Sequence, residues 1–308
     1  MVKISIIGAG AVGAQTASLI AQRQLGDVVL IDILGDMAKG KALDIAQSLP
    51  ILGSPVSVIG GDNYTLTKNS AIVVIVAGIA RKPGMTREQL LETNAKIVRE
   101  VTKKAVEHSP NIIFIVVTNP LDAMSYVVKK VSGFPRERII GMAGILDSAR
   151  FRYFLAQEAG VTVDKVEALV LGSHGEEMVP MLAKIKGKPA IDIIGSEKMK
   201  KAVEKVRNGG AEIVHLLKTA SASFAPAAAI AEMVESITKD QKKILPCSVF
   251  LEGEYGVNGC CIGVPVVLGK KGVENIVDVE MTAEDEKKFK LAANSIREMI
   301  DHAEKYIK

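Results

Sequence analysis

The sequence predicts an α/β protein in which a doubly wound parallel sheet is followed by an α+β unit. Its first half alternates short β-branched runs with longer helical patterns. Its second half contains helical stretches and then a series of short strand-like runs that glycines interrupt. A glycine-rich turn directly after the first apolar run is the third observation, because it joins a strand to a helix.

Five apolar runs predict the strands of the first half. Most of them lack alternation, as expected for parallel strands that helices cover on both faces. The predicted strands are Val2–Ile7, Val28–Ile31, Val56–Ile59, Ala71–Ala77 and Ile112–Val117. The helices predicted between them are Gly13–Arg23, Met37–Ser48, Thr86–His108 and Asp122–Val131. This alternation favours parallel pairing through right-handed crossovers.

The second half has a different pattern. Two helices are predicted early in it, Ile145–Ala159 and Lys198–Ala222. The glycine-broken runs of Cys247–Val279 predict an antiparallel meander. Thr282–Lys308 predicts a closing amphipathic helix with Thr282 as its N-cap. We place the domain boundary near Met142–Ile145, which divides the chain into residues 1–143 and 144–308.

Composition and charge argue against several classes of protein. The net charge of +4 is spread along the chain, so neither a nucleic-acid-binding arm nor a polybasic membrane patch is expected. No apolar run reaches the roughly 18 residues of a membrane-spanning helix. The three cysteines form no CxxC pair and are odd in number, which argues against a disulfide framework. We expect a soluble, cytoplasmic protein that uses no metal ion.

The segment after the first predicted strand carries the glycine pattern of a dinucleotide-binding Rossmann turn. The first glycine permits the tight turn, the second lets a pyrophosphate approach, and the third lets helix and strand pack closely. The helix N-terminus would then bind the phosphates. The alternative is a tight strand–helix turn without a ligand. The residues expected to contact the cofactor here are Gly8, Ala9, Gly10, Ala11, Val12 and Gly13.

An acidic residue ends the second predicted strand. Asp32 follows Gly13 by about 20 residues, the spacing at which an acid accepts the ribose hydroxyls of the adenosine half. Its charge would repel a 2′-phosphate, so NAD is predicted in preference to NADP. The alternative is a solvated turn residue. No second acid follows in the same turn, so the preference depends on Asp32 alone.

Four further segments resemble the lactate/malate dehydrogenase family. Ala77–Arg87 is similar to its mobile loop, and Val117–Asp122 is similar to the segment after its fifth strand. Leu146–Arg150 and Gly172–Gly175 are similar to its catalytic blocks. The matches keep the family's order and spacing from residue 4 to about residue 180. The resemblance implies reversible hydride transfer between NAD(H) and malate or oxaloacetate.

A histidine is the expected proton donor, because among unperturbed side chains only His changes charge near neutral pH. His174 stands among glycines after an apolar run, which suits close approach to a ligand. His108 and His302 lie in charged stretches and are expected to face solvent, whereas His215 is expected in a core or an interface. Asp147 is the expected partner of His174, with a helix cap as the alternative role.

The remaining site residues are implied by the resemblance. Arg150 would clamp the carboxylate beside the reacting carbon, and Arg87 would polarise the carbonyl. Arg81 would meet the distal carboxylate of a C4 diacid. The segment Gly78–Asn94 would act as a lid. Residues expected to contact substrate or nicotinamide around these groups are Asn94, Val117, Thr118 and Asn119, with a possible cis bond at Asn119–Pro120.

Two competing functions stay open on the sequence. A lactate dehydrogenase would share most of these residues, but the family's lactate enzymes usually carry Gln and Glu where this chain has Arg81 and Met85. Ser221–Pro226, at the expected far wall of the pocket, matches the malate pattern only loosely. A dinucleotide-sensing module without turnover would need only the Rossmann half. The resemblance also implies a homo-oligomer, with a tetramer favoured over a dimer.

Overall fold

The computed structural model of the protein describes residues 1–80, 84–175 and 177–307. Its strands are β1 (Lys3–Ile7), β2 (Asp27–Ile31), β3 (Val58–Gly61), β4 (Ile72–Ile75), β5 (Ile113–Val116), β6 (Ile139–Gly141), β7 (Val166–Gly172), β8 (Met178–Ile185), β9 (Lys188–Pro189), β10 (Lys243–Glu252), β11 (Asn258–Gly269) and β12 (Gly272–Ile276). Its α-helices are α1 (Ala11–Gln22), α2 (Gly35–Leu52), α3 (Arg87–His108), α4 (Leu121–Ser132), α5 (Gly144–Ala159), α6 (Ala190–Leu217), α7 (Phe224–Thr238) and α8 (Ala283–Ala303).

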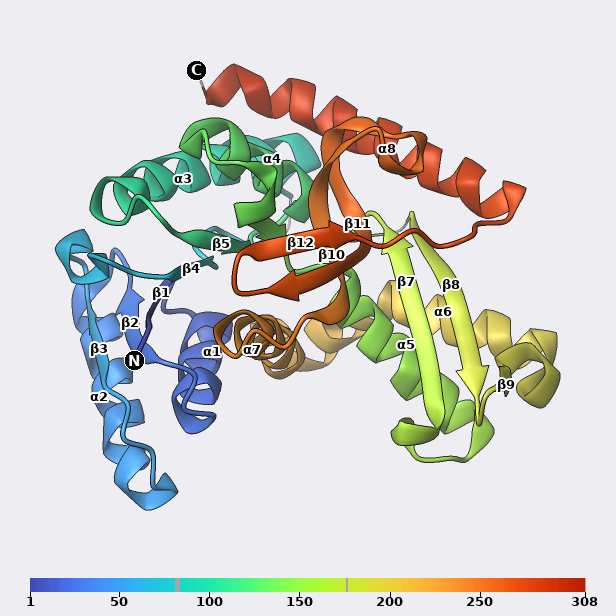
Figure 1. The fold of residues 1–308 in the computed structure, drawn as a ribbon, viewed down its shortest axis with the longest axis horizontal. Helices are drawn as coiled ribbons and strands as arrows, with labels where there is room; N and C mark the ends of the chain where they lie inside the picture. The colour runs from blue at the N-terminus through green and yellow to red at the C-terminus, as the bar shows by residue number, and fades with distance from the viewer. Residues whose placement is uncertain (81–83, 176, 308) are drawn as a thin grey trace.

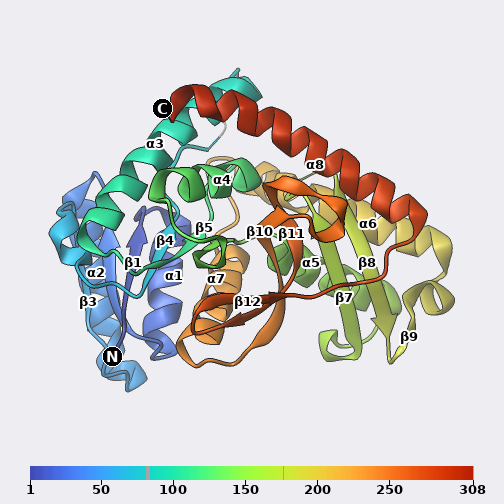
Figure 2. The ribbon, with the colours of Figure 1, turned by 45° about the horizontal axis from the view of Figure 1, so that its top comes forward.

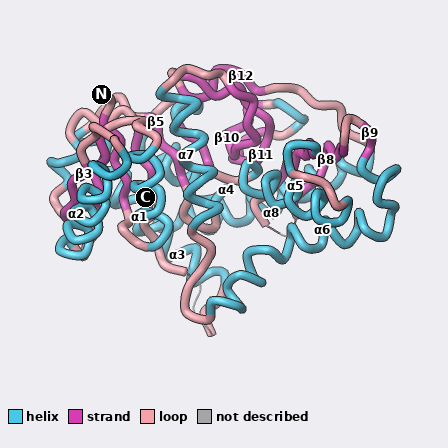
Figure 3. The backbone as a smooth tube through the Cα atoms, turned by 90° about the horizontal axis from the view of Figure 1, so that it is seen from below, coloured by secondary structure: helices cyan, strands magenta, loops and turns pink. Residues whose placement is uncertain are grey.

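One continuous sheet runs through the described residues in the order β3-β2-β1-β4-β5-β6-β10-β11-β7-β8-β9, with β12 paired to β11 (Figure 1). The first six strands are parallel. Their order is that of the doubly wound dinucleotide-binding fold. Figure 3 shows α2 at one end of the molecule and α6 near the other, with the strands β10, β11 and β12 at one edge between them.

Both faces of the parallel part are buried, which explains its unbroken apolar runs. Neighbouring residues of one strand point to opposite faces. Ile6 of β1 packs into a core with Ala17 of α1, whereas Ile7 packs into a second core with Ala95 of α3. Alternation could not appear in such strands, because water reaches neither face.

The second half of the sheet is antiparallel and adjoins the first through β6. Gly141 of β6 pairs with Ser248 of β10, and β10, β11 and β12 form the predicted meander. Helices α5 and α6 pack on β7 and β8 around Phe151 and Val206. Helix α8 lies across α4 and β11 (Figure 2). It begins at Thr282, whose side chain accepts the backbone N–H of Asp285, so the predicted N-cap is confirmed.

The α/β class and every helix predicted in the first half are confirmed, but three features of the second half were missed. Helix α7 was not predicted, because its alanine-rich sequence is buried on nearly every side and shows no polar face. Strand β8 was not predicted either. Helix α6 begins at Ala190, well before the predicted Lys198, and bends at Gly195, where φ is +79°. Among the described helices, none is long and apolar enough to cross a membrane.

Candidate active site

The glycine turn after β1 has the shape of a phosphate cradle. Gly8 has φ of +111°, and a Cβ there would lie 2.7 Å from the backbone nitrogen of Ala77. A Cβ on Gly13 would lie 1.8 Å from the carbonyl oxygen of Gly8, so helix α1 packs this closely only with glycine. A Cβ on Gly10 would meet no described atom within 4 Å. Space above Gly10 and the free N–H groups of α1 therefore fit a pyrophosphate.

Asp32 is held beside this cradle. One carboxylate oxygen accepts the backbone N–H of Ala9 at 2.7 Å, and the other accepts that of Leu34 at 3.0 Å. Lys41 of α2 donates to the carbonyl oxygen of Ala9 at 2.6 Å. The cradle is thus fixed from both sides, with the acid at the end of β2 where a ribose is expected. Lys41 was not singled out in the sequence, and a lysine inside a helical pattern gives no signal of this contact.

The ends of β4 and β5 meet around a buried amide. Asn94 is fully buried, and its side chain bonds the N–H and C=O of Ile79 and the carbonyl of Asn119. Thr118 donates to the carbonyl of Ala77 at 2.8 Å. Asn119 itself is exposed at the end of its strand, and its peptide bond to Pro120 is cis as predicted. Asn94 therefore holds these two loops together, and its predicted contact with the cofactor after lid closure stays a prediction.

The predicted proton donor and its partner are in direct contact. His174 Nδ1 lies 2.8 Å from Asp147 Oδ2, and Arg150 lies 3.5 Å from Asp147 Oδ1. The three side chains are between 6% and 17% exposed, so they are largely but not completely shielded from solvent. Ala143 occupies the N-cap of α5, and Asp147 stands one turn inside the helix. The alternative role of Asp147 as a helix cap is therefore wrong.

The environment of His174 favours its charged form. Burial opposes the imidazolium, but the charge of Asp147, its hydrogen bond and the charge of Asp122 outweigh burial and raise the pKa of His174. Because a carboxylate accepts at Nδ1, that nitrogen carries a proton, and Nε2 is left to exchange a proton with a substrate.

The lid residues are described only in part. Arg81 lies outside the described residues. Arg87 is exposed at the first position of α3, directly after the N-cap Thr86, which forms a reciprocal capping box with Gln89. Arg87 therefore lies at a capped helix end inside Gly78–Asn94, the segment predicted as the lid. Ser221–Pro226 spans the end of the connection between α6 and α7 and the first residues of α7, and its Phe224 is 73% exposed.

Two family models together match nearly the whole chain. Residues 2–141 match the NAD binding domain of lactate/malate dehydrogenases, and residues 145–307 match their alpha/beta C-terminal domain. The chain belongs to the lactate/malate dehydrogenase family. A curated malate dehydrogenase from Bacillus israeli is 50% identical over 302 residues, which cover 97% of each chain.

Solved structures of the lactate/malate dehydrogenase family share the fold throughout. Malate dehydrogenase from Cryptosporidium parvum is 42% identical with a TM-score of 0.96 over 99% of each chain. The lactate dehydrogenase of the same organism, complexed with lactic acid and NAD, is 39% identical with a TM-score of 0.95 over 98% of each chain. Overall shape therefore does not separate the two activities.

The structure adds site residues that the sequence analysis did not assign. Asp122 was quoted only as the end of a motif, yet its buried carboxylate accepts the backbone N–H of His174 at 3.0 Å. Gly209 and Gly210 of α6 lie against Arg150, where a Cβ would come within 3.7 to 3.8 Å of its side chain. A Cβ at either position would make an ordinary van der Waals contact, so the packing against Arg150 does not itself require glycine.

Among the described residues, the other three histidines form no hydrogen bond or ion pair with His174 or Asp147. His108 is half-buried at the end of α3, and His302 stacks on Tyr306 with ring centroids 6.5 Å apart. His215 is exposed on α6, so its predicted place in a core is wrong, and an interface stays a prediction. The three cysteines are buried free thiols, as expected.

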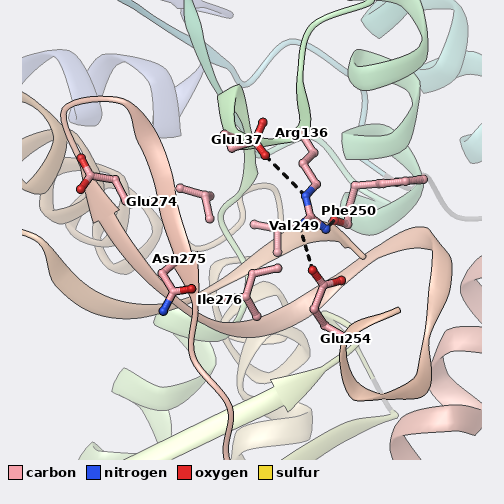
Figure 4. A pocket seen from close by; sticks show the side chains of 9 residues that line it. Arg136, Glu137, Val249, Phe250, Glu254, Glu274, Asn275 and Ile276 are labelled. Carbon is pink, nitrogen blue, oxygen red and sulfur yellow. Dashed lines mark hydrogen bonds and ion pairs between the residues drawn. The ribbon is translucent and has the colours of Figure 1, made fainter. Parts of the chain in front are cut away.

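A separate hollow of about 240 Å³ lies beside β10 and β12. Figure 4 shows Arg136 at its wall, with ion pairs to Glu137 and Glu254. Its volume is below the roughly 300–1,000 Å³ of ligand sites, and none of the predicted reacting residues lines it. We interpret the hollow as a gap beside the ion pairs of Arg136 and not as a ligand site.

Proposed function

We propose that the chain is an NAD-dependent malate dehydrogenase that interconverts malate and oxaloacetate. The observation that carries this proposal is Asp147, whose carboxylate contacts both His174 and Arg150. One side chain thereby orients a proton donor and a carboxylate-binding cation in one largely shielded site. Relatives at about 50% identity that are named malate dehydrogenase support the choice of substrate.

The cradle of Gly8, Gly10 and Gly13 would hold the pyrophosphate, and Asp32 would accept the ribose hydroxyls. Asn119, exposed at the end of its strand, would face the nicotinamide half. When bound, NAD(H) supplies or accepts the hydride at the reacting carbon.

His174 would move the proton. In reduction, the imidazolium gives its Nε2 proton to the carbonyl oxygen, and in oxidation the neutral ring accepts it from the hydroxyl. Asp147 stabilises the charged ring and keeps it in one tautomer. Reduction of the oxo acid requires a protonated ring, and the raised pKa of His174 favours this protonated form.

The arginines would bind the anionic parts of the substrate. Arg150 would grip the carboxylate beside the reacting carbon through two parallel hydrogen bonds. Arg87 would stabilise negative charge on the reacting oxygen after lid closure. Arg81 would pair with the distal carboxylate, which lactate and pyruvate lack.

The test of the malate assignment compares oxaloacetate with pyruvate as substrates for NADH oxidation. If the lid closed on pyruvate, which lacks the distal carboxylate, Arg81 would be buried without a partner. Such a loss costs about 3–5 kcal/mol, or roughly two to four decades in a rate ratio. The wild type should prefer oxaloacetate by several orders of magnitude in kcat/KM, and Arg81→Gln should remove most of that preference. Replacing Arg150 should depress turnover of both substrates.

Two outcomes would contradict the malate assignment, and a third would contradict the role of Arg81. A wild-type preference for pyruvate would identify a lactate dehydrogenase. Binding of NADH without turnover of either oxo acid would identify a sensing module. If the ratio of kcat/KM for oxaloacetate to that for pyruvate stays within about threefold of wild type in Arg81→Gln, another segment, such as Ser221–Pro226, determines the substrate specificity.

The cofactor assignment has its own test. A carboxylate facing a 2′-phosphate costs on the order of 1.4 kcal/mol, so kcat/KM for NADH should exceed that for NADPH by at least about tenfold. Asp32→Ser should narrow that ratio. Equal efficiency of the wild type with both cofactors would reject the role of Asp32.

We also propose a cytoplasmic homo-oligomer, a tetramer in preference to a dimer, with domains that meet at residues 143 and 144. Exposed apolar side chains on two helices support association. They are Leu43, Ile51 and Leu52 on α2 and Val214, Leu216 and Leu217 on α6. Light scattering that gives a monomer at micromolar concentration would contradict this part of the proposal.

A further inference from the structure

Asp122 is a buried carboxylate at the centre of the site. It is the second residue of α4, directly after the cis-proline turn that carries Asn119. Only 4% of it is exposed. Its Oδ1 accepts the hydroxyl of Ser248 at 2.6 Å, and its Oδ2 accepts the backbone N–H of His174 at 3.0 Å. Both oxygens are therefore committed to fixed donors.

These two bonds join three parts of the chain at one side chain. Helix α4 and Asn119 belong to the cofactor-binding half, whereas Ser248 lies on β10 and His174 on the turn after β7. Asp147 of α5 contacts the imidazole ring itself. The ring is thus fixed by one carboxylate and its backbone by another, which leaves little freedom for the proton donor.

Among the residues that the structure describes, the charges that act most strongly on the ring of His174 sum to zero only when the ring is protonated. Asp122 and Asp147 contribute two negative charges, and Arg150 contributes one positive charge. Cys260 and Cys261 of β11 also face Asp122, but burial raises the pKa of both thiols, to about 11 for Cys260, so they stay neutral. The imidazolium supplies the missing positive charge.

We propose that Asp122 is a positioning residue of the reaction: its carboxylate fixes the backbone of His174 and, as a second negative charge beside the ring, favours the imidazolium. This role rests on the proposed function of His174. Asp122 carries its charge at a cost, because burial raises its own pKa to about 6 in spite of both hydrogen bonds. A neutral residue would suffice if the turn needed only a hydrogen-bond acceptor.

The test is a titration of the His174 ring in the free protein by ¹H–¹³C NMR of labelled histidines. The His174→Asn variant identifies its signal among the four histidines. Asp122→Asn retains an oxygen for the His174 N–H but removes the charge. The pKa of His174 should fall by at least about half a unit in Asp122→Asn. The alkaline limb of kcat/KM for oxaloacetate should move to lower pH by the same amount.

Glu254→Gln is the matched control, because it neutralises a carboxylate that also adjoins β10 but belongs to the Arg136 cluster. It should leave the His174 titration unchanged. A folded Asp122→Asn whose His174 pKa stays within about 0.2 unit of wild type would overturn the proposal.

Ser248→Ala provides a second variant if Asp122→Asn does not fold. Loss of the hydroxyl donor raises the pKa of Asp122 further, so part of its charge disappears near neutral pH and the His174 pKa should fall by a smaller amount. No fall would again overturn the proposal. The NMR titration needs no turnover, so a shifted pKa in a protein whose wild type is inactive on oxaloacetate would reject the proposed function and leave only the effect of Asp122 on the pKa of His174.

Discussion

Strand β10 adjoins two clusters of charged side chains, and the carboxylates in the two clusters differ in burial and in the direction of their pKa shifts. At Ser248, the strand donates to Asp122 in the buried cluster around His174. Two residues further on, the carbonyl of Phe250 accepts from Arg136, which also pairs with Glu254 at 2.8 Å. Arg136 and Glu254 are 25% and 30% exposed, whereas Asp122 is almost wholly covered.

The pKa values of the two carboxyls move in opposite directions. Burial is the largest influence on Asp122 and raises its pKa to about 6. The hydrogen bond from Arg136 is the largest influence on Glu254 and lowers its pKa to about 2. A cation bonded directly to a partly hydrated carboxylate satisfies it, whereas two neutral donors only partly compensate a fully buried one. The cluster of Arg136 and Glu254 therefore serves stability, whereas the buried carboxylate of Asp122 carries a cost in stability that function must justify.

The largest difference between the clusters should appear in turnover. His174→Asn should lower kcat by about a hundredfold or more, since a general acid–base group contributes roughly 10²–10⁴-fold. NADH affinity, measured by fluorescence titration, should change little. His302→Asn, at a histidine that stacks on Tyr306, is the control and should keep full activity. If His174→Asn loses NADH binding and turnover together, the residue is not the proton donor.

The next difference concerns stability against pH. A carboxyl with a raised folded pKa stabilises the protein fully below its unfolded value of 3.8, and this contribution disappears as pH rises through about 6. Asp122→Asn should therefore gain stability relative to wild type between about pH 4 and pH 7, on the order of 1–3 kcal/mol.

Glu254 should show the opposite sign. Its lowered pKa stabilises the folded protein above the unfolded value of 4.5, and this contribution is lost as pH falls towards 2. Glu254→Gln should be less stable than wild type near neutral pH, and the gap should close as pH falls from about 5 to about 2. Urea unfolding across this pH series measures both variants. The same sign for both would refute the contrast between the clusters.

The smallest effect is expected at Arg136. Arg136→Met removes a partly exposed set of ion pairs and should cost about 1 kcal/mol of unfolding free energy, with kcat/KM for oxaloacetate unchanged within about twofold. Melting curves and steady-state kinetics of the same preparation check both statements. A large loss of activity with normal stability would show that the hollow beside Arg136 takes part in function.

The sequence alone predicted those features that depend on contacts between residues close together in the chain. Gly8, Gly13 and Asp32 form such features, because a tight turn and a strand end impose their requirements over a few neighbours. The capping residue Thr282 forms another. The histidine suited to chemistry stood out from its glycine neighbours, and its partner Asp147 came from the family resemblance.

Long-range contacts decided the rest. Asp122 and His174 are 52 residues apart in sequence, and Ser248 is 126 residues from Asp122, so no periodicity could announce their bonds. Helix α7 escaped prediction because burial on nearly every side removed the polar face that marks a helix. Sequence fixes which side chains are available. The tertiary structure decides which side chains are buried together. Burial in turn decides that the charge of Glu254 is compensated by Arg136, whereas the charge of Asp122 is compensated only in part.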